Sequence, residues 1–149
     1  WGVTECILKN CTISNGGDGN NMDVRNTVIS RVIEIDCDMS NASNASSDQA
    51  STGHNACEIV RINGNYHDVS GQVIADVSGC KTWCLGTLLS NSRVNKIGAY
   101  TGGTMWLDNV HISGCDTYDI QNEVGSTTYI RNCILEKGVN QISGTLANY

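Results

Sequence analysis

The most regular feature of the chain is a short pattern of apolar and polar positions that recurs five times. Each copy holds an apolar residue, a residue of any type, an asparagine, two further residues and a second apolar residue. Asparagine tolerates left-handed backbone angles and hydrogen-bonds well in tight turns, so each copy predicts a short strand followed by a turn. The five asparagines are Asn10, Asn26, Asn91, Asn109 and Asn132.

Repeated units of this kind predict a solenoid. Stacked coils bury a continuous apolar column that no single coil buries alone, and their corner asparagines lie above one another. With roughly 20 residues per coil, a usual solenoid period, the chain holds about six to seven coils. We therefore predict an all-β fold, a single right-handed parallel β-helix in which residues 1–149 form one domain.

Strand patterns dominate the rest of the sequence, and no segment has the periodicity of a helix. Apolar and acidic residues alternate from Ile33 to Met39, and the apolar segment from Val73 to Val77 lies between two glycines. The segment from Ser40 to Asn55 is small, polar and low in complexity. It predicts a loop, around residues 40–55, that projects from the solenoid.

Composition argues against two kinds of partner. The chain carries a formal net charge of -6, and its 9 Lys and Arg residues are spread thinly, so we expect no nucleic-acid binding. No apolar run approaches the roughly 18 residues of a membrane-spanning helix, so we expect no membrane span.

The 8 cysteines bear on whether the protein belongs to an oxidising compartment. An even number in a small chain favours disulfides over a metal site and predicts an extracellular, secreted or virion-surface protein. The alternative is free thiols stacked in the core, because free cysteine packs as a small hydrophobic residue. The disulfide candidates are Cys6, Cys11, Cys37, Cys57, Cys80, Cys84, Cys115 and Cys133.

Asparagine-centred coils, glycine-rich turns and a strand-only pattern resemble the pectin-lyase-like superfamily of right-handed parallel β-helices over the whole chain. This superfamily includes pectate lyases, other polysaccharide lyases and hydrolases, and phage tailspikes. The segment from Met105 to Asn109 is similar to the Trp-Ile-Asp-His stretch of one pectate lyase family, with Asn109 at the place of the histidine. The polygalacturonase signatures, such as Gly-His-Gly, do not occur in the sequence.

An acidic segment and two basic residues are candidates for a calcium site and a catalytic base. If the isoleucines beside them face inward, Glu34, Asp36 and Asp38 share an outer face, where three carboxylates suit Ca²⁺ as a cofactor. The resemblance implies a calcium ion that bridges acidic sugar and protein, and an Arg or Lys base for β-elimination. We expect Arg61 to stand outward as that base, with His67 as a second candidate because imidazole titrates near neutrality. The alternative is a solvated acidic face with ordinary surface residues.

Four aromatic residues are candidates for carbohydrate binding, because the apolar faces of sugar rings suit aromatic rings. Aromatic residues make up only 5% of the chain, so some of the four are expected to fill the core instead. The candidates are Tyr66, Trp83, Tyr100 and Trp106.

Two classes of function follow. The favoured class, since no catalytic signature is intact, is a structural or adhesive module, such as a spike or fibre. It contacts a polysaccharide or glycan surface, or self-associates as a trimer or an end-to-end filament. The alternative is a calcium-assisted uronate lyase, which requires Arg61 on the same outer face as Asp36 and Asp38.

Overall fold

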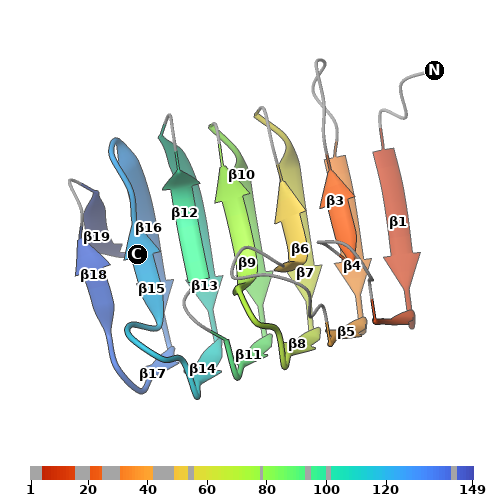
Figure 1. Cartoon of the computed structure of the whole chain (residues 1–149). Helices are drawn as coiled ribbons and strands as arrows, with labels where there is room; N and C mark the ends of the chain where they lie inside the picture. The colour runs from red at the N-terminus through yellow and green to blue at the C-terminus, as the bar shows by residue number, and fades with distance from the viewer. Residues whose placement is uncertain are drawn as a thin grey trace.

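The computed structural model describes residues 5–15, 21–24, 31–41, 49–53, 56–77, 79–92, 95–99, 102–141 and 144–149. Within these residues the regular elements are all strands, which form three parallel sheets of seven, six and six strands. Figure 1 shows the coils lying side by side from the N-terminal end to the C-terminal end. The predicted all-β parallel solenoid is confirmed for the described part of the chain.

Successive strands of the chain enter the three sheets in turn, and each strand pairs with its equivalents in the neighbouring coils. Sheet A contains β1 (Glu5–Lys9), β4 (Arg31–Ile35), β7 (Glu58–Ile62), β10 (Lys81–Leu85), β13 (Gly103–Asp108), β16 (Ser126–Arg131) and β19 (Thr145–Asn148). Sheet B contains β2 (Thr12–Ser14), β5 (Asp38–Ser40), β8 (Asn65–His67), β11 (Leu88–Ser90), β14 (His111–Ser113) and β17 (Ile134–Leu135). Sheet C contains β3 (Met22–Val24), β6 (Gln49–Gly53), β9 (Gln72–Val77), β12 (Asn95–Ala99), β15 (Ile120–Asn122) and β18 (Val139–Gln141).

Left-handed residues turn the chain from sheet A to sheet B. In the first five coils, the backbone N–H of the corner residue donates to the last sheet A carbonyl of the next coil, as Asn10 does to Ile35 at 2.9 Å. Asn, Asp and Gly are the residues that adopt this conformation most readily. The corner residues are Asn10, Asp36, Asn63, Gly86, Asn109 and Asn132, with φ of 53°, 53°, 52°, 62°, 55° and 54°.

The predicted stack of asparagines is confirmed for Asn10, Asn109 and Asn132, which share this corner. Asn91 lies instead at the corner between sheets B and C, where its φ is 53°. Asn26 lies outside the described residues. The prediction of a common corner is therefore right for three of the five copies, wrong for Asn91 and untested for Asn26.

Amide side chains fill this first corner between coils. Gly86 has no side chain, and a Cβ atom built on it would lie 2.7 Å from Asn63 Oδ1 and 3.9 Å from Asn109 Nδ2. The amides of the neighbouring coils therefore converge on the place that a corner side chain occupies elsewhere.

Asn109 offers a test of why these residues stand at the corner. Asn109→Ala is expected to lower the free energy of unfolding by about 1–2 kcal/mol, because alanine bears the left-handed strain. Asn109→Gly removes the same amide without that strain, so it is expected to lower the free energy of unfolding by less. Urea unfolding followed by circular dichroism measures both. Equal losses would contradict the backbone account and assign the role to the amide.

The inward-facing side chains form a column of two apolar clusters along the solenoid. They come from all three sheets, and most are completely buried. At the two ends, the inward side chains of the first and last coils are only partly buried, because no further described coil covers them. Fully buried examples are Met39, Ile59, Ile74, Leu107, Ile112 and Ile120.

A charged cluster interrupts this column between the second and third coils. Glu34 and Arg61 pair in register on β4 and β7, and both side chains are 0% exposed. Arg61 Nε lies 3.5 Å from Glu34 Oε2, and the Tyr66 hydroxyl donates to the same oxygen at 2.6 Å. Burial and the adjacent Glu34 carboxylate raise the pKa of Tyr66 far above its ordinary value, so its hydroxyl stays protonated as a donor.

The expectation that Glu34 and Arg61 face outward is therefore wrong. The chain turns at Asp36, so the segment from Ile33 to Met39 is two strands and not one. On β4 the inward positions are Val32 and Glu34, and the isoleucines face outward. Cys37 and Met39, beyond the corner, face inward as predicted.

Removing one member of this cluster is expected to be far worse than removing all three. Glu34→Leu removes the carboxylate that faces Arg61 and Tyr66 in the core and is expected to lower the free energy of unfolding by about 3–5 kcal/mol. The triple variant Glu34→Leu, Arg61→Met, Tyr66→Phe replaces the cluster with apolar groups and is expected to recover most of that loss. Urea unfolding measures both. A triple variant no more stable than Glu34→Leu would contradict the account.

All eight cysteines are free thiols, so the prediction of disulfides is wrong. Most fill inward positions as small hydrophobic residues, which is the alternative left open above. Burial raises the pKa of Cys37 and of Cys115, which keeps both thiols protonated. The argument from disulfides to an oxidising compartment thereby loses its support. The cysteines that are exposed by 2% or less are Cys37, Cys57, Cys80, Cys84 and Cys115.

The predicted loop around residues 40–55 is partly strand. Ser40 ends β5, and β6 pairs in parallel with β3 and β9. A segment of small polar residues can form this strand because the ladder uses backbone hydrogen bonds alone. Residues 42–48, 54 and 55 lie outside the described residues.

Candidate functional site

Apolar side chains run along the middle of the outer face of sheet A, and charged side chains lie at its edges. The third and fifth positions of β4, β7 and β10 point outward and carry aliphatic or aromatic side chains, and the fourth positions of β13 and β16 carry outward aromatic side chains. Ile7 in the first coil is 58% exposed. The other outward apolar side chains are partly buried, and together with Ile7 they form one apolar strip. A contiguous apolar strip at the surface is a candidate contact surface. Its outward apolar residues are Ile7, Ile33, Ile35, Val60, Ile62, Trp83, Leu85, Trp106 and Tyr129.

Three aromatic rings form a ladder on this face. Trp83 and Trp106 stack with ring centroids 4.7 Å apart and planes 5° from parallel. Trp106 and Tyr129 stack at 5.7 Å and 10°. The ring faces are thus directed along the solenoid axis, toward the neighbouring coils. Both faces of Trp106 are covered by ladder neighbours, whereas Trp83 has a neighbour in the ladder on one face only.

The other face of Trp83 borders a hollow of about 340 Å³. The ladder stops at Trp83 because the equivalent positions of the two preceding coils hold the smaller residues Val60 and Ile33. The volume falls within the range of about 300–1,000 Å³ that is usual for small-molecule sites. The lining residues are Arg31, Ile33, Glu58, Val60, Trp83 and Leu85.

An ion pair lies at one end of the hollow. Arg31 Nη2 and Nε donate to Glu58 Oε2 at 2.6 and 3.0 Å, and Arg31 Nη1 lies 3.8 Å from Glu5 Oε2. The hydrogen bond that Arg31 donates to Glu58 raises the pKa of Arg31 above its ordinary value, so the guanidinium stays charged. The site therefore offers a flat aromatic face, an aliphatic floor, N–H donors and a carboxylate acceptor.

Of the residues predicted to carry sugar binding, only the two tryptophans lie on this face. Tyr66 is 0% exposed and belongs to the core, and Tyr100 lies outside the described residues. Arg31, Glu58 and Tyr129 also belong to this face but were not predicted from the sequence. A signal existed, because Trp83, Trp106 and Tyr129 are each 23 residues apart, which is one coil.

The residues predicted to bind calcium and to catalyse lyase chemistry are dispersed. Glu34 and Arg61 lie inside the solenoid, Asp36 is an exposed corner residue, and Asp38 belongs to the outer face of sheet B. The structure does bring Asp38 together with His67, whose Nε2 lies 3.4 Å from Asp38 Oδ1. Among the described residues, no group of three or more His, Cys, Asp or Glu side chains could hold a metal ion.

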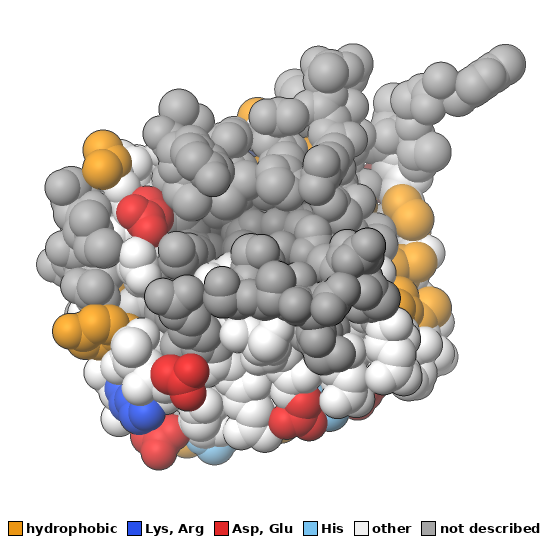
Figure 2. Space-filling view, in the orientation of Figure 1, with side chains coloured by type: hydrophobic (Ala, Val, Ile, Leu, Met, Phe, Trp, Pro, Cys, Tyr) orange, Lys and Arg blue, Asp and Glu red, His pale blue; other side chains and the backbone are white. Residues whose placement is uncertain are grey.

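His67 lies between two carboxylates on sheet B. Besides Asp38, it contacts Asp68, whose Oδ2 lies 2.6 Å from His67 Nδ1. Hydrogen bonds from His67 and then from Asn91 hold the pKa of Asp68 below its ordinary value. Figure 2 shows acidic and histidine side chains along the lower edge of the molecule, where Figure 1 places the strands of sheet B. The contacts of His67 with Asp38 and of Asn91 with Asp68 link successive coils.

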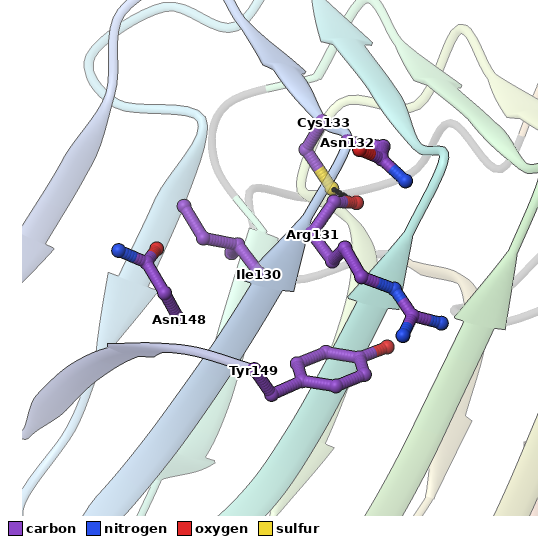
Figure 3. Close-up of a pocket in the computed structure, with 6 residues that line it drawn as sticks. All are labelled: Ile130, Arg131, Asn132, Cys133, Asn148 and Tyr149. Carbon is purple, nitrogen blue, oxygen red and sulfur yellow. Dashed lines mark hydrogen bonds between the residues drawn. The ribbon is translucent and has the colours of Figure 1, made fainter.

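A second hollow, also about 340 Å³, lies at the C-terminal end. Figure 3 shows Arg131 beside the ring of Tyr149, with a guanidinium-to-centroid distance of 4.8 Å. Arg131 also pairs with Asp108, and this hydrogen bond lowers the pKa of that carboxyl. Ile130 and Cys133 belong to the partly buried inward column, so this hollow is the uncovered end of the solenoid core.

The chain matches no protein-family model, and no curated protein matches it in sequence. In the part of the chain that the structure describes, no helix has the length and apolar character needed to cross a membrane.

Proposed function

We propose that the chain is a non-catalytic adhesive module that contacts glycans through the outer face of sheet A. The observation that carries the proposal is the uncovered face of Trp83, which forms one wall of a hollow with an aliphatic floor and the Arg31–Glu58 pair at its end. Apolar walls with a few convergent polar groups are typical of small-molecule sites. Aromatic faces suit the apolar faces of sugar rings.

A second copy of the chain fits this face less well than a glycan. A five-residue strand spans about 16 Å, and seven strands stacked about 4.8 Å apart extend about 29 Å, so the face covers roughly 460 Å² in plan. A stable protein interface buries about 800 Å² on each partner. The face is therefore small for a dimer, and its hollow has the size of a sugar site.

Fold and surface together favour membership of the pectin-lyase-like superfamily, as a binding member. Three parallel sheets and a stacked amide corner support that assignment. A module of this kind would act where glycans are displayed, at a cell or virion surface. We do not propose a lyase, because Arg61, its expected base, is 0% exposed and cannot reach a substrate.

Trp83→Ala tests this proposal. The variant is expected to weaken binding to a neutral glycan by at least about tenfold, or about 1.4 kcal/mol, because it removes the stacking wall. Isothermal titration against glycans selected on an array measures the change. Leu88→Ala is the matched control, since Leu88 is an exposed apolar residue of sheet B. Wild-type affinity in Trp83→Ala, or an equal loss in Leu88→Ala, would contradict the assignment.

A further inference from the structure

The orientation of Trp83 restricts how a sugar can enter the hollow. Trp83 stacks face to face with Trp106 of the next coil, so its free face looks back along the solenoid axis toward Val60. A pyranose that stacks on that face must place its ring plane parallel to the indole. The sugar therefore stands on edge over Val60 and Ile33 instead of lying flat on sheet A.

The shape of the hollow agrees with this orientation. Its lining includes first, third and fifth positions of sheet A strands, represented by Arg31, Val60 and Leu85. The hollow thus extends along the strands, across the solenoid, and the ladder that begins at Trp83 closes it on the C-terminal side. Equatorial linkages of a stacked pyranose lie near its ring plane, which is perpendicular to the solenoid axis, so the attached sugars continue across the solenoid and not along it.

The charges of the hollow favour an uncharged ligand. Arg31 is its one cationic lining residue among the described side chains, and Glu58 and Glu5 already flank that guanidinium. Lys81 follows in the same column one coil later but does not line the hollow. The formal net charge of -6 also opposes acidic polymers. Arg31 N–H groups and the Glu58 carboxylate can still donate to and accept from sugar hydroxyls.

From these observations we infer that the hollow binds a neutral glycan that crosses the solenoid along the strands of sheet A, with one pyranose on edge against Trp83. This inference rests on the proposed function and adds to it the charge class of the ligand and the direction of its chain. Only the sugars within the width of the sheet, about 16 Å, contact the protein.

The test compares oligosaccharides by isothermal titration with the full chain. The probes are the tri- and hexasaccharides of the β-1,4-linked neutral series (cello-, xylo- and manno-) and hexagalacturonate. We expect at least one neutral series to bind, hexagalacturonate to bind at least tenfold more weakly, and the hexasaccharide to exceed its trisaccharide by less than about threefold, because a transverse chain soon leaves the surface.

Val60→Trp is the decisive variant. It extends the aromatic ladder by one rung into the hollow, so it is expected to retain the fold, seen by circular dichroism, and to weaken binding of the neutral hexasaccharide at least tenfold. Leu88→Trp adds the same bulk on sheet B and is expected to bind as wild type. If Val60→Trp does not fold, the comparison of tri- and hexasaccharide in the wild-type protein still decides the direction.

The outcomes separate the two claims. No binding of any glycan by the wild-type chain would overturn the proposed function and this inference together. Preferred binding of hexagalacturonate would overturn the neutral class and leave the proposed function standing. A hexasaccharide that binds tenfold or more tightly than its trisaccharide would overturn the transverse direction, and wild-type binding by folded Val60→Trp would overturn the hollow as the site.

Discussion

The structure depends on a backbone constraint, which is the left-handed residue at the corner between sheets A and B. One such residue in each coil ends the sheet A strand and restarts the alternation of side chains in sheet B. Because side chains alternate along a strand, the position of the corner decides which residues face the core and which face solvent. The interior column, the buried charges and the outer apolar face all follow from it.

The candidate site follows from this choice of inward and outward positions, combined with equal coil length. Three successive coils place aromatic residues 23 residues apart at the same outward position, and parallel pairing then stacks their rings. The preceding coils carry Val60 and Ile33 there, so the stack ends against an open space. The hollow lies where the outward side chains of one column change in size.

The position of the corner also accounts for what could and could not be predicted from the sequence. Corner asparagines have a conformational reason to recur, so the solenoid and its stacked corners were predictable. The orientation of Glu34 was not, because alternation from Ile33 to Met39 looks like one continuous strand. Asp36 could have signalled the break, since an aspartate can replace asparagine at a left-handed corner. Trp83 was identifiable as a residue type, but its free face depends on the size of neighbours one coil away.

The most direct test of which strand positions face the core is labelling of the native cysteines, read by mass spectrometry. Without reductant, all eight thiols are expected to react with a maleimide in urea, because none is in a disulfide. In the native protein, Cys57, Cys80 and Cys84 are expected to be protected, since each is 0% exposed. A cysteine introduced by Lys81→Cys, three positions before Cys84 on the outward side of β10, is expected to react rapidly. Fast labelling of native Cys84, or fewer than eight reactive thiols in urea, would contradict the account.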